Sequence, residues 1–290
     1  MTTVPVRKLF SIDDLPAFSP WPARLLGLDS WKHRKKTAAE VIREFDQEKW
    51  GVLLERVRTS PVAVNIDDVE RWSVEGVPDS LVSIGDRLEL LSPIQARRRY
   101  LALIESVLRR YLPAAAVAEL GAGYGSVILQ LARRPRFAGV PLLAGEYTER
   151  GCELIRQLSQ ASGLRIVVGH CDLGSRTPVD FAVPEGALLF TSMAVHYVPR
   201  LSEGYVHAIA ALRPAAVVNV EPCYEHCSSS TLTGLLRRRY IEINDYNRNL
   251  MSVLRAQQAA GTLRIVEEIP AVIGINPLLP VSVVVWVPER

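Results

Sequence analysis

Two short stretches of the chain concentrate the residue types that acid–base chemistry uses. The first, 191–197, reads TSMAVHY and contains His196; the second, 221–227, reads EPCYEHC and contains Glu221 and His226. The ordinary pKa of an imidazole lies close to neutrality, so His196 is suited to take up a proton near pH 7. The carboxylate of Glu221 either shares in that chemistry or anchors backbone amides.

The same stretches offer ligands for a metal ion. Cys223 and Cys227 are four residues apart, and His226 and Glu221 are close by. Nitrogen, oxygen and sulfur atoms of this kind bind divalent ions, and a bound ion lowers the pKa of an attacking group. The C-x-x-C spacing of structural zinc sites is missing, so we predict no metal. Metal-assisted chemistry, with His196, Glu221 and His226 as ligands, is kept as the alternative.

A glycine-rich loop indicates which ligand the chain holds. The stretch 117–126 reads VAELGAGYGS, a short apolar strand followed by glycines at 121, 123 and 125 and then by a helix. Glycine allows positive φ and a close approach of a ligand to the backbone. The amides at the start of the helix attract negative groups. We therefore expect a nucleotide-like ligand in this loop.

The spacing of the loop narrows the choice of nucleotide. A dinucleotide fingerprint, G-x-G-x-x-G, needs its third glycine at position 126, where the chain has Ser126. The pattern is instead E-x-G-x-G-x-G, and it resembles the signature loop of the class I methyltransferases that depend on S-adenosylmethionine (SAM). The resemblance implies that the loop passes under the methionine part of SAM and that the acid helps to hold its amino group. By this resemblance, the residues that bind the cofactor include Glu119, Gly121, Gly123 and Gly125.

Two further acids follow the next two predicted strands. Glu146 closes the apolar run 140–144, about 20 residues past the loop, where an acid accepts hydrogen bonds from ribose hydroxyls. Asp172 follows a third strand, 165–168. The resemblance implies that Asp172 binds the adenine amino group.

The order of apolar runs predicts the sheet that positions these residues. After the first three strands come a fourth at 187–192, a fifth at 215–221, and two last ones at 263–269 and 281–287. The last two are too close for a crossover helix, so they form an antiparallel pair. We predict an α/β fold: a seven-stranded, mostly parallel, Rossmann-like sheet with a C-terminal antiparallel hairpin, which matches the methyltransferase sheet. Its ligand lies at the carboxyl ends of the strands.

The part before the sheet is predicted to be helical. Thr37 and Glu40 form a T-x-x-E start signal for an amphipathic helix of about twenty residues. Residues 61–85 read as short helices or turns, and a helix from Pro93 runs to Leu112. We place a helical accessory or cap domain at 1–91 and a SAM-binding methyltransferase domain at 92–290. By analogy with small-molecule methyltransferases, the cap walls the acceptor pocket.

A polar patch interrupts the last long helical region, 231–260. It reads IEINDYNRNL, and its Tyr246 and Asn247 are candidates for the acceptor pocket. Its charged residues equally suit a solvated face. We include Tyr246 with His196, Glu221 and His226 as candidate catalytic residues.

Composition limits the partners. The chain has 290 residues, 48% of them hydrophobic, a net charge of +3 and four cysteines. It lacks both a signal-like segment and an apolar run long enough for a bilayer, so we expect a cytoplasmic protein with reduced cysteines and no membrane partner. The basic clusters 97–99 and 237–239 lack interleaved aromatics, so we read them as solvated helix faces and expect no nucleic acid.

These patterns together predict a SAM-dependent methyltransferase. The acceptor is a small molecule with an oxygen or nitrogen nucleophile, and His196 is the candidate general base. Two alternatives stay open: a nicotinamide-dependent oxidoreductase and a non-catalytic SAM-binding protein. The acceptor and the methylated atom are not specified by the sequence, and a homodimer stays open as the oligomeric state.

Overall fold

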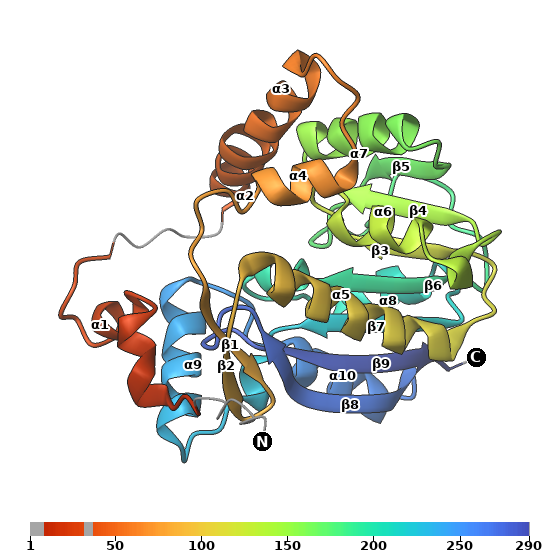
Figure 1. Cartoon of the computed structure of the whole chain (residues 1–290). Helices are drawn as coiled ribbons and strands as arrows, with labels where there is room; N and C mark the ends of the chain where they lie inside the picture. Colours follow the sequence, from red (N-terminus) through yellow and green to blue (C-terminus); the bar gives the residue numbers. More distant parts are fainter. Residues whose placement is uncertain (1–8, 32–36, 290) are drawn as a thin grey trace, which may run out of the picture.

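One nine-stranded sheet organises the chain (Figure 1). The computed structural model describes residues 9–31 and 37–289. The strands run in the order β2-β1-β8-β9-β7-β6-β3-β4-β5. They are β1 (Ser80–Ile84), β2 (Arg87–Leu91), β3 (Val117–Leu120), β4 (Leu142–Glu146), β5 (Ile166–His170), β6 (Leu188–Ser192), β7 (Ala216–Glu221), β8 (Leu263–Gly274) and β9 (Val281–Pro288).

The middle of this sheet is Rossmann-like. Strands β5, β4, β3, β6 and β7 lie side by side in this order and are parallel to one another. The chain passes from β3 outward to β5 and then returns to β6 on the other side of β3, which creates a switch in strand order between β3 and β6. Strand β9 pairs antiparallel with β7 and with β8, so the predicted C-terminal hairpin is confirmed.

The prediction of seven mostly parallel strands is wrong, because the sheet is mixed and has nine. The two additional strands, β1 and β2, form a hairpin, and β1 pairs antiparallel with β8. Ile84 pairs with Arg87, so Gly85 and Asp86 form a two-residue turn in which Gly85 has a φ of +57°. The middle of β1 is buried on both faces, including Ser83, so its sequence lacks the alternation of a half-exposed strand.

Helices cover both faces of the sheet (Figure 1). The helices that follow β2 in the chain are α5 (Pro93–Leu108), α6 (Ser126–Ala132), α7 (Glu149–Ala161), α8 (Gly204–Ala210), α9 (Leu232–Ile243) and α10 (Leu250–Ala259). Short helical segments are η1 (Ile12–Ala17), α1 (Trp21–Leu25), η3 (Arg109–Tyr111), η4 (Pro135–Phe137), η5 (Val195–Tyr197) and η6 (Tyr224–His226). Apolar side chains of α5, α6 and α7 pack on one face, and those of α8 and α10 pack on the other.

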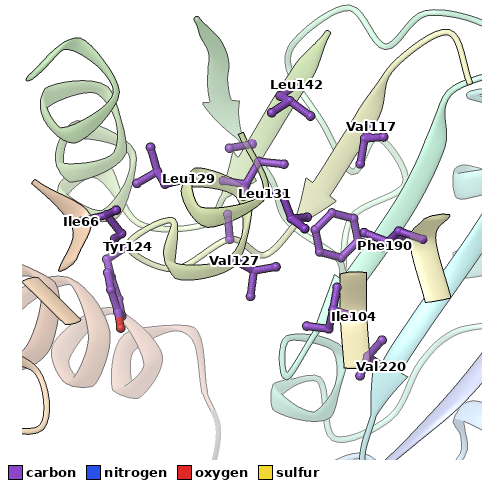
Figure 2. Packing of buried hydrophobic residues seen from close by; sticks show 14 of the residues in the cluster. Ile66, Ile104, Val117, Tyr124, Val127, Leu129, Leu131, Leu142, Phe190 and Val220 are labelled. Atoms are coloured by element: carbon purple, nitrogen blue, oxygen red, sulfur yellow. The ribbon is translucent and has the colours of Figure 1, made fainter. Parts of the chain in front are cut away.

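Alternate residues of each buried strand fill these two layers. Figure 2 shows part of the first layer, where Phe190 of β6 lies near Val117 of β3 and Ile104 of α5. The neighbouring strand residues Ala118 and Leu189 belong to the second layer. Burial on both faces fixes the register of the parallel strands, and so fixes where their carboxyl ends lie.

The helix predicted after Thr37 is present, with an unexpected middle. It consists of α2 (Ala38–Val41), a π-helical segment η2 (Ile42–Trp50) and α3 (Gly51–Thr59). The Thr37 side chain accepts a hydrogen bond from the amide of Glu40, as expected for a helix start. These elements and α4 (Ile66–Trp72) lie at the β5 end of the sheet, where η2 and α3 pack against α7 (Figure 1).

The division into domains at residue 91 stays a prediction. Residues 1–8 and 32–36 of the proposed accessory domain lie outside the described residues. The strands at 80–91 belong to the same sheet as the rest of the chain. None of the helices within 9–31 and 37–289 combines the length and apolar character that crossing a membrane requires.

The helical region predicted over 231–260 consists of two helices, α9 and α10, separated by residues 244–249. Asp245 has a positive φ of 53°, which ends the helical path. The Asn247 side-chain carbonyl accepts hydrogen bonds from the amides of Asn249 and Leu250, and its Nδ2 donates to Val198 O at 2.7 Å. The polar patch therefore ends one helix and starts the next.

Candidate functional site

Two cavities meet at the glycine loop, on the carboxyl edge of the central strands. The first has a volume of about 360 Å³, and Gly121, Gly123, Glu146 and Asp172 are among its lining residues. We call it the glycine-loop cavity. The second has a volume of about 470 Å³ and is lined by residues that include Glu119 and His196. We call it the His196 cavity. Both volumes fall in the range of small-molecule sites.

Several residues line both cavities. Gly121 and Gly123 line both, and so do Phe45 and Trp50 of η2. The loop and the π-helical segment therefore lie at the junction, so a ligand placed over the loop is accessible from both sides. The sequence analysis did not predict that η2 would place the rings of Phe45 and Trp50 at this junction.

A glycine is needed at each of the three loop positions for a different physical reason. Gly121, Gly123 and Gly125 have φ angles of +83°, +59° and +82°. A Cβ on Gly121 would lie 2.3 Å from the Cβ of Ala194, and one on Gly123 would lie 3.2 Å from the Trp50 ring. Gly125 is the N-cap of α6 and lines neither of these two cavities. Its role in the structure is the turn into α6.

Glu119 and Glu146 are buried carboxyl groups beside the loop. Glu119 accepts a hydrogen bond from Ile128 N of α6 at 3.0 Å. Burial raises the pKa of Glu119 well above its ordinary value; the Ile128 bond opposes this shift, and the charge of Glu146 adds to it. A cation entering the His196 cavity would favour the charged carboxylate.

Glu146 links β4 to the loop. One of its oxygens accepts from Gly123 N at 2.8 Å, and the other accepts from the amide and the hydroxyl of Thr148 at 3.0 and 2.7 Å. Burial raises the pKa of Glu146, and the Thr148 bonds lower it. Its carboxylate both shapes the loop and faces the glycine-loop cavity.

Asp172 and Tyr147 line the same cavity as Glu146. Asp172 accepts from Gly174 N at 2.8 Å. The pKa of Tyr147 is raised by burial and by the charge of Asp172. Tyr147 lines the cavity, and its ring centroid is 5.6 Å from that of His170. An aromatic face beside an acid is suited to a purine base with an amino group. Sequence reasoning missed Tyr147, although it directly follows Glu146.

His196 is buried and lines the His196 cavity. It is 1% exposed, and within the described ranges neither ring nitrogen has a hydrogen-bond partner. Its Nδ1 lies 3.5 Å from Oε2 of Glu221, just beyond an ordinary hydrogen bond. The Tyr197 and Tyr246 rings pack on it with centroids at 4.0 and 4.9 Å. An unpartnered buried imidazole next to a carboxylate is able to accept a proton from a bound ligand.

Glu221 fixes the turn that carries His196. Its carboxylate is fully buried and accepts from the amides of Ala194, Val195 and His196 at 2.9, 3.1 and 3.3 Å. The amide-anchoring interpretation of Glu221 is therefore realised in the structure. The same carboxylate lies 3.5 Å from Nδ1 of His196, and its part in acid–base chemistry stays a prediction.

The other two candidate catalytic residues lie differently. Tyr246 packs on the rings of His196 and Tyr197 but lines neither cavity. Its pKa is raised by burial and by Tyr197. His226 points away, with Nδ1 2.8 Å from Ser282 Oγ and Nε2 2.8 Å from Glu268 Oε1. The structure therefore brings His196, Glu221 and Tyr246 together and leaves His226 apart.

The four cysteines are buried and unpaired. Burial raises the pKa of the thiols of Cys223 and Cys227, the latter to about 11. Over the residues that the structure describes, no group of three His, Cys, Asp or Glu side chains is placed to hold a metal ion. The metal alternative therefore gains no support from the geometry.

A buried polar network beside the loop was not predicted. Nη1 of Arg97 donates to Glu70 Oε2, Ser73 Oγ and Tyr124 OH at 2.7, 2.6 and 2.8 Å. Glu70 also accepts from Tyr124 OH and from Ser126 Oγ. The prediction that Arg97 lies on a solvated helix face is wrong, because its guanidinium group pairs with Glu70. The sequence analysis missed this pair because the two residues are far apart in the sequence. Figure 2 shows Tyr124 beside Ile66 of α4, the helix that carries Glu70.

Comparison with known proteins gives distant structural similarities. No protein-family model matches the chain, and no curated protein is similar to it. The magnesium protoporphyrin IX methyltransferase ChlM from Synechocystis PCC 6803, solved with bound S-adenosylhomocysteine (SAH), is 13% identical, covers 87% of this chain and 100% of its own, and has a TM-score of 0.47. PigF, solved with SAH, is 16% identical, with coverages of 86% and 72% and a TM-score of 0.45. The mitomycin 7-O-methyltransferase MmcR is 16% identical, with coverages of 83% and 67% and a TM-score of 0.43.

Similarities at this distance do not carry function from those enzymes to this chain. The fold rests on the chain's own features: five parallel strands with a switch at β3, a final strand inserted antiparallel, and a glycine loop at the switch point. These features are those of a Rossmann-like α/β fold with its ligand loop at the switch in strand order.

Proposed function

We propose that the protein binds SAM at the glycine loop and transfers its methyl group to the oxygen or nitrogen of a small molecule in the His196 cavity. Three acids at the ends of β3, β4 and β5 are the proposed ligands of the cofactor. Asp172 and Tyr147 suit the adenine, Glu146 the ribose hydroxyls, and Glu119 the amino group of the methionine part.

One observation carries this proposal: the two cavities meet over Gly121 and Gly123. A cofactor that lies along the loop has its middle at this junction. In SAM the sulfonium methyl group occupies the middle of the molecule, between adenosine and the amino acid. An acceptor in the His196 cavity is then close to the methyl carbon, and holding the two in line supplies much of the rate.

His196 is the proposed general base. The acceptor oxygen or nitrogen attacks the methyl carbon, the carbon–sulfur bond breaks, and the electron pair of that bond stays on sulfur to give SAH. The proton of the acceptor passes to His196, whose new positive charge is stabilised by Glu221 at 3.5 Å. Tyr246 is a positioning residue in this scheme, because its ring packs on the imidazole.

The N-terminal helices are proposed to close the site. Phe45 and Trp50 line both cavities from η2, and Asp46 in the same segment accepts from Arg150 N of α7 at 2.8 Å. Residues 1–91 would thus act as a cap on a catalytic domain of residues 92–290, and apolar walls of this kind favour a small acceptor over a polymer.

Calorimetry with SAM and SAH tests the cofactor. The Glu146→Gln variant loses the charge at the ribose position, and we expect binding to weaken about tenfold, because a charge-assisted hydrogen bond is lost. Glu149→Gln is the matched control, since Glu149 lies at the exposed start of α7 and lines neither cavity. Equal effects of the two substitutions would remove the basis of the assignment.

The alternative functions predict different results in the same experiments. A nicotinamide-dependent oxidoreductase would bind NAD or NADP and leave SAM unbound. A non-catalytic protein would bind SAM but release no SAH with any member of a panel of phenols, alcohols and amines. SAH release with at least one acceptor supports the proposal.

A further inference from the structure

A third cavity, of about 510 Å³, lies at the start of α9. Its walls also come from residues 10–12, from the turn between β1 and β2, and from residues 270–277. It shares no lining residue with the glycine-loop cavity or the His196 cavity. Whatever binds here is held apart from the methyl-transfer site.

A buried cation lines this cavity. Arg237 of α9 is only 9% exposed, and its Nε donates to Pro277 O at 3.0 Å. In the described part of the chain, no carboxylate lies within ion-pair distance of its guanidinium group, and neither Nη atom has a hydrogen-bond acceptor. Burial lowers the pKa of Arg237, and electrostatic interactions with Cys227 and, to a smaller extent, Asp86 counteract this. Since arginine stays protonated in proteins, the group is a buried positive charge without a counter-ion.

The amino end of α9 adds positive potential at the same place. Thr231 is the N-cap, and its hydroxyl accepts from Gly234 N at 3.1 Å. This leaves the amides of Leu232 and Thr233 without an acceptor from the described chain. Thr233 and Arg237 are four residues apart, so they share one face of the helix, and the arginine side chain leans toward the amino end. Both residues line the cavity.

Among the described lining residues, the acidic and imidazole side chains are Asp86 and His226. Asp86 lines it from the exposed turn of the β1–β2 hairpin and forms no ion pair with Arg237. His226 also lines it, but its two ring nitrogens are occupied by Ser282 and by Glu268. The guanidinium group is thus the buried charge, and Asp86 is a more distant, solvated one.

We propose that this cavity binds a phosphate monoester. The planar guanidinium fork and the free amides of α9 match the oxygens of a phosphate group, and the hydroxyls of Ser11, Ser228 and Thr233 are further donors. The cavity is larger than one phosphate ion, and Phe10, Leu88 and Pro270 offer apolar surface for an organic group. This site lies beyond the proposed methyl transfer and does not depend on it.

Calorimetry on the full chain with phenyl phosphate and with inorganic phosphate tests the site. We expect phenyl phosphate to bind, and Arg237→Gln to weaken its binding about tenfold because the charge-assisted bonds are lost. Arg239→Gln is the matched control. Arg239 lies on the same helix, is exposed, and lines none of the three cavities, so its loss is expected to change affinity less than about twofold.

Two more variants separate binding from folding. Asp86→Asn removes the opposing charge, so we expect it to strengthen phosphate binding about threefold at low salt, the reverse of a folding defect. Thr233→Val keeps the shape and Arg237 while removing a hydroxyl donor, and we expect weaker binding with an unchanged melting temperature.

Three outcomes would overturn the proposal: no binding of either probe by the native protein, equal losses in the Arg237 and Arg239 variants, or weaker binding in Asp86→Asn. Phenyl phosphate that binds no more tightly than inorganic phosphate would also overturn it, because the cavity would then serve the free ion. SAM binding in the same variants is a separate readout, which reports on the methyl-transfer proposal alone.

Discussion

Glu221 holds the turn after β6 and lies beside the ring of His196. Glu221 accepts three backbone amides and so fixes the turn after β6. It also lies 3.5 Å from an imidazole that has no other polar partner in the described chain. Because the amides already satisfy the carboxylate, the imidazole stays available to a ligand. The pair is better suited to accepting a proton from a ligand than to exchanging one internally.

We predict that His196→Asn lowers kcat about 100-fold while SAM affinity stays within about twofold. The ring lies on the acceptor side of the junction, so the change removes proton transfer and leaves the cofactor contacts. SAH release and calorimetry measure the two quantities. His207→Asn, on the exposed side of α8, is the control. An unchanged kcat would mean that alignment alone drives the reaction.

We predict that Gly123→Ala weakens SAM binding about tenfold. The added Cβ meets the Trp50 ring at 3.2 Å, and φ is +59°, so the loop must move. Gly163→Ala is a close control, because Gly163 has a φ of +65° and nothing within 4 Å of the added atom. Calorimetry on both proteins separates backbone strain in general from strain at the ligand. The same loss of affinity in both would argue against a ligand at Gly123.

At the scale of elements, the break between α9 and α10 supports the turn that carries His196. The backbone amide of Asn247 donates to His196 O at 2.9 Å, and its side chain holds Val198 O and the start of α10. The end of one helix is thereby attached to the loop that carries the proposed base. Tyr246 packs on the imidazole from the same segment.

We predict that Asn247→Ala destabilises the protein by about 2 kcal/mol, because it removes a helix cap and a buried hydrogen bond to Val198. Urea unfolding measures this. Turnover should fall as well, since the His196 loop loses a support. Arg248→Ala, the neighbouring change at a more exposed position, should alter stability by less than about 0.5 kcal/mol. A loss of stability with full turnover would show that this segment does not contribute to the function of the site.

The elements that sequence alone predicted are those whose signals are local. The glycine loop, the acids at or near the ends of β3, β4 and β5, and the C-terminal hairpin all follow from apolar runs and spacing. Strand β1 was missed because its pairing with β8 buries it on both faces and removes the alternating pattern. Arg97 was read as solvated because its partner Glu70 is adjacent only after folding. The burial of His196 likewise depends on Tyr246, from a distant segment.

At the scale of the whole molecule, the buried acids couple stability to pH. Glu119 and Glu146 have folded-state pKa values raised above their ordinary value of 4.5, mainly by burial. The folded state therefore holds protons more tightly than the unfolded chain does. Their contribution is fully present below the unfolded pKa and is lost as pH rises through the folded values. The pKa of Asp67 is lowered, so that residue acts in the opposite sense, at more acidic pH.

We predict that the melting temperature of the unliganded protein falls as pH rises from about 5 toward neutrality. Glu119→Gln should flatten this slope, because glutamine still accepts the Ile128 bond and carries no charge to bury. Scanning calorimetry across that range measures both proteins, with Glu149→Gln as an exposed control. A slope that is the same in all three would show that Glu119 is not the titrating group.

The pairing of β1 with β8 ties an early hairpin to a strand near the end of the chain. A ribosome delivers the chain from its amino end, so the hairpin emerges long before its partner is made. Until residues 263–288 appear, β1 and β7 both expose unpaired backbone to neighbouring nascent chains. While the middle of the chain is being made, these two strand edges therefore have no partner within the chain.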